Sequence, residues 1–368
     1  MSDAPVANIH LQFRKFEVFE NRRTSDEPHQ AVNQLNGKKE EHSLEFARLA
    51  HSFEKMEKTS SRLALIAILA ELFRSIDSPD EIAKVCYLVQ GRVAPFFEAL
   101  EIGMAEKSVA RSIAITYHTT VEHVVTLYAA LGDLGRVAEQ ASKEAGIVPQ
   151  VLHIDDVFQG LKTIAQTAGK GTVEKRIALL ASLLKQVDSV SAKYVVRIAL
   201  GNLRLGIGDA TMLDALATVK FHDTHKRKLL EGAYNKTSDL GLIARTLWQH
   251  PREEDALQAV ARLEVQVGKP IRPQLAERLP DAETIIKKMW VVDAQYKYDG
   301  FRTQIHKDGQ QVSIFSRNLE NMSQMFPEII EATRKQVQAD SVILDAEALA
   351  YHPVSEEFLP FKERSRVK

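Results

Sequence analysis

The sequence contains one cysteine, Cys86, so it can form no internal disulfide, and a structural zinc site built from several cysteines is not expected. It also lacks a long apolar run, because none reaches the roughly 18 residues that a membrane-spanning helix needs. The polar start, Met1 to Val6, has neither the basic nor the apolar region of a signal peptide. We therefore expect a soluble chain in a reducing, cytoplasmic setting.

A surplus of charge is missing as well. The 48 Lys and Arg residues against 49 Asp and Glu residues give a net charge of -1, whereas many nucleic-acid-binding domains are clearly basic. Any contact with a polyanion must then come from local patches. The candidates are Lys193, Arg197 and Arg204 in one stretch and the run 225–228 in another, although a short basic run is more often a solvated helix face.

With 368 residues, the chain exceeds the roughly 250–300 residues that one hydrophobic core usually serves, so we expect more than one domain. Residues 1–42 show no sustained periodicity and are predicted to form a loose N-terminal extension. From 43 to 262, apolar residues recur every three or four positions, which predicts an all-helical domain. Within it, Ser78, Pro79 and Glu81 predict a helix start in which Ser78 caps the first turn and Glu81 reaches back to the Ser78 amide.

Two prolines three residues apart, Pro270 and Pro273, interrupt the helical pattern and predict an extended linker over 263–273. In the remaining residues, 274–368, short alternating runs and a hairpin signal at 308–309 predict a mixed α and β region with much antiparallel pairing. The predicted strands are 291–298, 302–306, 312–316 and 342–351, and the predicted helices are 282–289 and 325–337. The expected fold class is thus multidomain, an all-helical domain followed by part of an antiparallel-sheet domain.

Lys297 stands near the end of the predicted strand 291–298, just before Asp299 and Gly300, where glycine permits a tight turn or the close approach of a ligand. A lysine held in this way suits a nucleophile, which attacks phosphorus after losing its proton, and a nearby arginine or metal ion favours that loss. On residue types alone, a solvated surface lysine paired with Asp299 is the more ordinary interpretation.

The string YKYDGFR at 296–302 resembles the K-x-D-G signature of ATP-dependent DNA ligases of the archaeal and eukaryotic replicative type. Further segments that resemble this family, in order along the chain, are 201–206, 233–239, 270–276, 315–318 and 343–347. The first two resemble parts of the ligase DNA-binding domain, and the others resemble the nucleotidyltransferase (adenylation) domain. The resemblance covers residues 43–368, so the regions 43–262 and 274–368 are expected to be these two domains.

The resemblance implies an enzyme that seals nicks in duplex DNA with ATP and Mg²⁺, in replication, repair, recombination and cell division. Lys297 would become adenylated, AMP would pass to the 5′-phosphate at the nick, and the 3′-hydroxyl would displace it. By similarity, Arg302 and Arg317 would bind the nucleotide or the nick phosphate. Glu347 would contact the ribose or help to hold the metal. Gln295, where many relatives have glutamate, would read adenine through its amide.

For the helical domain, the resemblance implies contacts with the backbone of nicked double-stranded DNA. The residues concerned are Lys193, Arg197, Gly201, Arg204 and Gly206. Two glycines flanking Arg204 predict a turn whose amides approach phosphates. Without the resemblance, a glycine-ended helix with solvated arginines is the simpler interpretation. A sliding clamp is a further expected partner, no membrane contact is expected, and a monomer is expected.

The sequence ends at Lys368, before the later ligase motifs and the OB-fold domain that the resemblance implies, so we expect an incomplete, C-terminally truncated ligase. One alternative is a non-catalytic DNA-binding protein that keeps the helical domain and part of the pocket. Another is an RNA ligase or mRNA-capping nucleotidyltransferase, which would lack the long helical domain. The expected location is the cytoplasm, with the nucleoid, in a prokaryote, or the nucleus in a eukaryote.

Overall fold

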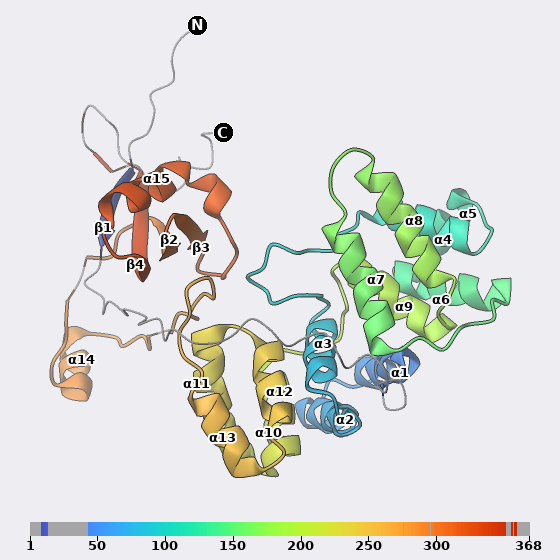
Figure 1. The fold of residues 1–368 in the computed structure, drawn as a ribbon, viewed down its shortest axis with the longest axis horizontal. Coiled ribbons are helices and arrows are strands. Elements are labelled where there is room, and N and C mark those ends of the chain that lie inside the picture. The colour runs from blue at the N-terminus through green and yellow to red at the C-terminus, as the bar shows by residue number, and fades with distance from the viewer. Residues whose placement is uncertain are drawn as a thin grey trace, which may run out of the picture. The chain divides into compact units, whose positions relative to one another are not determined.

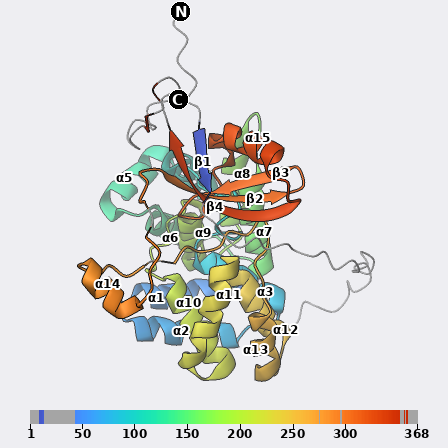
Figure 2. The same cartoon turned by 90° about the vertical axis from the view of Figure 1, so that its left-hand side faces the viewer.

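The computed structural model describes residues 9–13, 43–274, 276–294, 296–350, 355 and 357–358. The chain divides into two compact units (Figures 1 and 2). The helical unit contains the described residues of Pro28–Tyr234 and Ser238–Glu264. The sheet unit contains the described residues of Met1–Glu27, Asn235–Thr237 and Val265–Lys368.

The helical unit consists almost entirely of α-helices, which confirms the prediction from apolar spacing. Its first helices are α1 (Phe46–Glu57), α2 (Arg62–Arg74), α3 (Pro79–Val89), α4 (Glu106–Thr116), α5 (Val121–Leu131), α6 (Leu134–Ala145) and α7 (Ile154–Gln166). They are followed by α8 (Thr172–Leu184), α9 (Ser189–Ala199), α10 (Asp209–Phe221), the 3-10 turn η1 (Thr224–Lys226), α11 (Arg227–Thr237), α12 (Leu240–Gln249) and α13 (Glu253–Ala261). None of the helices in the described ranges has both the length and the apolar character needed to span a bilayer.

The start of α3 shows where the predicted capping holds and where it does not. Ser78 caps the helix, since its Oγ accepts a hydrogen bond from the Glu81 amide at 3.4 Å. The Glu81 carboxylate does not reach back to the Ser78 amide as predicted. It accepts instead from Ser43 Oγ at 2.6 Å and from the Leu44 amide at 2.9 Å. These donors come from the segment before α1, and spacing within one helix cannot reveal them.

One continuous apolar core, running from Leu44 to Val260, fills the helical unit. Helix α9 lies within it, and every residue from Ser191 to Ala199 is buried. It packs against α1 and α6, and the ring of Tyr194 meets that of Phe53 edge-on at 5.3 Å. A helix buried on all sides is held by its neighbours over its whole surface, so groups on α9 have fixed positions.

The sheet unit contains four antiparallel strands in the order β1-β4-β2-β3. They are β1 (Ile9–Phe13), β2 (Phe301–Asp308), β3 (Gln311–Phe315) and β4 (Ser341–Ala350). The hairpin between β2 and β3 turns at Gly309, whose φ of 57° lies in the left-handed region that favours glycine. The predicted strands 302–306 and 312–316 are therefore confirmed with shifts of a few residues at their ends, and the predicted strand 342–351 is confirmed as far as Ala350, since residue 351 lies outside the described residues.

Helix α15 (Pro327–Gln336) covers one face of this sheet. On that face, Ile305, Ala346 and Ala348 pack against two further apolar side chains. One is Ile329 of α15, and the other is Phe326, the residue just before the helix. The remaining elements are α14 (Ala282–Met289), which buries none of its residues, and the 3-10 turn η2 (Ser323–Met325). Because side chains alternate along a strand, the opposite face carries the other half of the β2 and β4 residues.

Candidate functional site

That opposite face carries the predicted nucleotide-binding residues Arg302 and Glu347. These two pair across β2 and β4, as Gln304 and Asp345 do, and residues paired in this way point to the same face. Arg302 also forms a bidentate ion pair with Asp345. Its Nε donates to Oδ1 at 2.9 Å and its Nη2 donates to Oδ2 at 2.6 Å. The side chains are 36% and 17% exposed. A guanidinium and two carboxylates therefore share a half-open polar face.

Gly300 brings the chain that follows Lys297 onto this face. A Cβ at Gly300 would lie 2.6 Å from Glu347 Cγ and 2.9 Å from the carbonyl oxygen of Ala348. The carbonyl belongs to the backbone of β4, so no side-chain rotation would relieve the contact. Glycine is needed here for close approach of the two chain segments. Lys297 thus lies three residues along the chain from a glycine that touches Glu347.

The contacts recorded for the described residues bring together Arg302, Asp345 and Glu347, and they do not include Lys297 or Arg317. Lys297 is exposed and belongs to a stretch without regular secondary structure. Gln295, expected to read adenine, lies outside the described residues. The structure therefore assembles part of the predicted site and leaves its nucleophile at the surface.

The predicted strand 291–298 is wrong for this structure. A strand forms when its amides and carbonyls pair with a neighbouring strand, and no strand among the described residues pairs with this stretch. Several of its apolar side chains are exposed, with Val291 76%, Val292 42% and Tyr296 84% exposed. The alternating pattern in the sequence marks a segment suited to a sheet, but the pattern carries no information about whether a partner strand is at hand.

Arg317 is presented by a tight loop after β3. The Ser316 hydroxyl accepts hydrogen bonds from the amides of Asn318 and Glu320, both at 3.2 Å, which closes the loop on itself. Leu319 is buried although its φ of 68° lies in the left-handed region, a conformation that costs a branched side chain about 1–2 kcal/mol. The loop is therefore fixed from within, and the exposed Arg317 side chain extends from a rigid base.

Two residues of β2 that the sequence analysis overlooked attach the linker to the same sheet face. Gly268 donates its amide hydrogen to His306 Nδ1 at 2.9 Å, and the Ile271 amide donates to Gln304 Oε1 at 2.7 Å. Burial lowers the pKa of His306 to about 4, so the ring is neutral and can accept. The signal was available in the sequence, because Arg302, Gln304 and His306 are alternate polar residues within one predicted strand.

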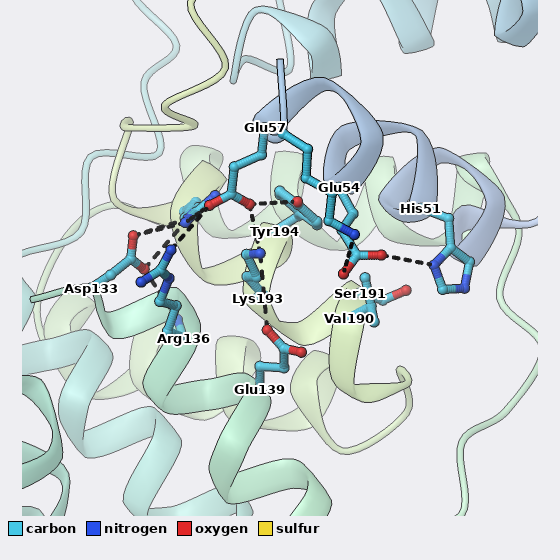
Figure 3. A network of polar contacts seen from close by, with 12 residues as sticks. His51, Glu54, Glu57, Asp133, Arg136, Glu139, Val190, Ser191, Lys193 and Tyr194 are labelled. Carbon is cyan, nitrogen blue, oxygen red and sulfur yellow. Dashed lines mark hydrogen bonds and ion pairs between the residues drawn. The ribbon is translucent and has the colours of Figure 1, made fainter. Parts of the chain in front are cut away.

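In the helical unit, Lys193 and Arg197 lie inside the protein, and the structure contradicts the expectation that they contact DNA. They are 6% and 3% exposed. Arg197 Nη2 is 2.9 Å from Glu57 Oε1 and 3.0 Å from Asp133 Oδ2. Lys193 Nζ is 2.6 Å from Glu57 Oε2 (Figure 3). Their charges are balanced by carboxylates of α1 and of the residue that caps α6.

Glu57 is the centre of this buried network. Burial alone would raise the pKa of its carboxyl, but hydrogen bonds from Arg197, Lys193 and Tyr194 outweigh that effect and lower it to about 2. A sequence signal existed here too. Lys193 and Arg197 are four residues apart, hence on one side of a helix that is otherwise apolar nearly all round, and such a helix is buried. Cations on it need buried partners.

The loop between α9 and α10 contains the other three predicted DNA-contacting residues. Gly201 and Gly206 have φ angles of 70° and 65°, and a Cβ at either would meet nothing within 4 Å, so both face open space. The side chain of Arg204 is 49% exposed, with Nη1 3.3 Å from Asp133 Oδ2. Of the three cationic candidates in this stretch, only Arg204 offers its charge at the surface.

The second basic run, 225–228, is largely engaged within the protein. Lys226 pairs with Glu253, and Arg227 Nε lies 3.4 Å from Asp214 Oδ1. Lys228 is exposed. Most of the charge of this run is therefore balanced locally, which leaves little for a polyanion.

The described residues contain no group of three or more His, Cys, Asp or Glu side chains that could hold a metal ion. Asp345 is engaged by Arg302, and Glu347 is the second carboxylate of this face. Mg²⁺ in phosphoryl-transfer sites often takes only one or two carboxylates, with phosphate oxygens and water completing its shell. The carboxylates of this face fit that mode of binding.

Comparison with protein families gives two matches. Residues 45–217 match a model described as DNA ligase N terminus, and residues 273–368 match a model described as ATP dependent DNA ligase domain. Together the two matches span most of the chain, and they fall on the helical unit and on the sheet unit respectively.

Several curated relatives are similar over most of the chain. A probable DNA ligase of Dictyoglomus thermophilum is 43% identical over 317 residues, which are 86% of this chain and 53% of that protein. A DNA ligase of Sulfolobus acidocaldarius is 39% identical over 333 residues, 87% of this chain and 54% of that protein. One of Sulfurisphaera tokodaii is 41% identical over 334 residues, with the same coverage. The chain spans about half the length of the curated relatives it matches.

Proposed function

This chain belongs to the ATP-dependent DNA ligase family, and we propose from that premise that it provides the adenylated lysine and the DNA-holding helices of a nick-sealing enzyme. The proposal assigns nucleotide chemistry to the sheet unit, around Lys297, and DNA backbone contact to the helical unit, around Arg204. It is supported by the separate match of each unit to a ligase family model.

In the proposed reaction, the Lys297 amine attacks the α-phosphorus of ATP, and the bond to the leaving pyrophosphate breaks. The product is a phosphoramidate between Lys297 and AMP. The 5′-phosphate at a nick then takes AMP from the lysine, and the 3′-hydroxyl attacks that phosphate and releases AMP. Each step is a transfer at phosphorus, for which positioning and charge stabilisation provide most of the catalysis.

Arg302 suits the role of a phosphate or ribose ligand because Asp345 holds its Nε and Nη2 edge. The far side of the guanidinium, with Nη1, can then donate to an oxygen of the nucleotide or the nick. Arg317, on its rigid loop, provides a second guanidinium in the proposal. Glu347 accepts from the ribose or gives one carboxylate to Mg²⁺, which neutralises phosphate charge when bound. Gln295 is proposed to accept from the adenine amine.

The observation that carries the proposal is the approach of Gly300 to Glu347, with a Cβ-to-Cγ distance of 2.6 Å if a side chain were added. This approach ties the segment that bears Lys297 to the polar face that bears Arg302.

We extend the proposal to the substrate, the metal, the oligomeric state and the location. We propose nicked double-stranded DNA as the substrate, Mg²⁺ as the metal, a monomer as the acting species and a reducing cytoplasmic or nuclear location. A sliding clamp remains a predicted partner.

The proposal is tested by incubating the 368-residue chain with α-labelled ATP and Mg²⁺ and separating the products under denaturing conditions. We expect label on the protein, lost in Lys297→Ala and kept in Lys287→Ala, a matched exposed lysine of α14 that pairs with Glu283. Label from GTP in place of ATP, label that survives in Lys297→Ala, or no label from either nucleotide would contradict the assignment.

The exposed, irregular position of Lys297 favours a second candidate, a DNA-binding protein without catalysis. The same chain would then bind nicked duplex DNA and take up no label. Measuring both properties on one preparation separates the two candidates.

A further inference from the structure

Asp133, which caps α6, contacts the backbone amide of Arg136 and the side chain of Arg204. Its Oδ1 accepts a hydrogen bond from the Arg136 amide at 3.1 Å, and its Oδ2 lies 3.3 Å from Nη1 of Arg204. The Arg136 and Arg204 side chains are 56% and 49% exposed, whereas that of Asp133 is 6% exposed. Two surface guanidinium groups therefore flank the network, since that of Arg204 contacts Asp133 and that of Arg136 lies 3.8 Å from Glu57. Figure 3 shows Arg136 and Asp133 together at one end of the network.

The network has more cations than its innermost carboxylates can balance. Glu57 and Asp133 contact four cationic side chains, those of Lys193, Arg197, Arg136 and Arg204. Glu139 lies 4.0 Å from Lys193 but is paired more closely with Lys143, at 2.6 Å. Since Lys193 and Arg197 are buried against the two carboxylates, the surplus positive charge resides on the exposed pair.

The position of Arg136 is not explained by the helix that carries it. It is the third residue of α6, and the amino end of a helix bears partial positive charge, so a cation there is locally unfavourable. Its Nη2 lies 3.8 Å from Glu57 Oε1, beyond hydrogen-bonding range, and Glu57 already accepts from Arg197 and Tyr194, both at 2.9 Å. An anion from outside the protein would balance this charge.

The two arginines are also held in a fixed relation. A Cβ at Gly135 would lie 2.7 Å from the carbonyl oxygen of Lys193, so the start of α6 presses against the backbone of α9. At the end of α9, the Arg197 carbonyl accepts the amide of Asn202, which begins the loop with Arg204. Both guanidinium groups thus extend from backbone that is anchored to α9.

We propose that Arg136 contacts the DNA backbone beside Arg204, so that the two side chains form a phosphate-binding surface at the junction of α6 and the loop that follows α9. This inference rests on the proposed function and extends it to a residue outside the ligase-like loop. Planar guanidinium groups bind phosphate oxygens through paired hydrogen bonds, and contacts of this kind fix the position of a duplex without reading its sequence.

The test measures binding of the 368-residue chain to a labelled nicked duplex by fluorescence anisotropy at several salt concentrations. We expect Arg136→Ala to weaken binding roughly tenfold, the loss of one charged hydrogen-bonded contact. The slope of log affinity against log salt should fall by about one, equally for duplexes of different sequence. Arg136→Lys keeps the charge and should restore most of the slope. Arg252→Ala is the matched control, since it removes an exposed arginine paired only locally, with Asp255.

The outcomes separate the inference from the proposed function. If Arg204→Ala weakens binding while Arg136→Ala and Arg252→Ala both match the unmodified chain, the inference is overturned and the proposed function stands. If the unmodified chain shows no salt-sensitive binding, the proposed function is contradicted, and so is the inference that rests on it. If Arg136→Ala reduces binding of a polyglutamate peptide but not of the duplex, the surface serves another anion and the inference is again overturned. Equal thermal midpoints for Arg136→Ala and Arg136→Lys exclude unfolding as the cause of a loss.

Discussion

The helical unit and the sheet unit place their predicted functional cations in opposite ways. In the helical unit, Lys193 and Arg197 are buried in a large core and balanced by carboxylates. In the sheet unit, Arg302 lies on a half-open face beside a small core, and Arg317 is exposed. The same residue type thus stabilises the fold in one unit and faces solvent or substrate in the other, and burial decides which.

The largest stability effect is expected at Arg197, on the helical side of the comparison. Arg197→Met leaves Glu57 and Asp133 without their shared partner, and breaking a buried ion pair from one side costs about 3–5 kcal/mol. Urea unfolding should therefore shift strongly for this variant. Arg252→Met, which disrupts an exposed pair, should change the free energy of unfolding by about 1 kcal/mol or less. Equal shifts in the two variants would show that the network does not support the core.

The next largest effect is a difference between the two units in how their stability depends on pH. Burial lowers the pKa of His306 from 6.5 to about 4, so the unfolded chain binds a proton at a higher pH than the folded one. Stability of the sheet unit should then be full above pH 6.5 and decline as pH falls toward 4, by roughly 3 kcal/mol. Glu57, with its pKa lowered from 4.5 to about 2, contributes stability that is lost only below pH 4.5.

Hydrogen exchange, corrected for the intrinsic pH dependence of amide exchange, should detect this order. Amides of β2 should lose protection in mild acid while those of α9 keep it, and His306→Gln should remove the difference between pH 7 and pH 5 in β2. Loss of protection in both units over one pH range would show that the two groups do not control separate transitions.

A third comparison uses two glycines that permit close approach. Gly135→Ala and Gly300→Ala each bring a methyl group within 3 Å of a backbone carbonyl, and overpacking of this kind costs about 1–3 kcal/mol. We expect Gly135→Ala to destabilise the helical unit and Gly300→Ala to reduce labelling by ATP without changing protection of α9. Gly232→Ala, where a Cβ meets nothing within 4 Å in a helix, should be neutral or slightly stabilising. A fully labelled Gly300→Ala chain would remove the argument that this glycine positions Lys297.

The smallest stability effect is expected at Arg302. Arg302→Met disrupts a partly exposed pair with Asp345, so the free energy of unfolding should fall by about 1 kcal/mol or less. Labelling by ATP should nevertheless fall by about 10²–10³, the usual loss when one charge-stabilising donor is removed from a reacting centre. An Arg302→Met chain that is strongly destabilised but labels normally would show that Arg302 supports the fold and not the reaction.

Spacing along the sequence predicted the elements well and their burial poorly. The three- and four-residue apolar period gave the helices, and the Asp308-Gly309 signal gave the hairpin, because these structures form from neighbours in sequence. The strand 291–298 was wrong because a strand needs a partner remote in the chain. Lys193 and Arg197 were wrongly assigned to the surface because their partners, Glu57 and Asp133, lie far away in sequence.

Part of the candidate site followed from the same reasoning. Alternation within a strand correctly placed Asp345 and Glu347 on one face, and pairing added Arg302 to it. The attachment of the linker by Gln304 and His306 was missed, since it depends on how a segment some 35 residues earlier folds back onto β2. The roles of Lys297, Arg302, Arg317, Glu347 and Gln295 remain predictions.

The central claim is that the amine of residue 297 forms the bond to AMP, and mapping the adduct tests it most directly. After incubation with ATP and Mg²⁺, the chain would be digested under conditions that preserve phosphoramidates, and the peptides would be weighed and fragmented. We predict one added AMP on the peptide that contains Lys297, localised to that side chain. AMP on another residue, or an unmodified Lys297 peptide in a chain that has taken up label, would contradict the account.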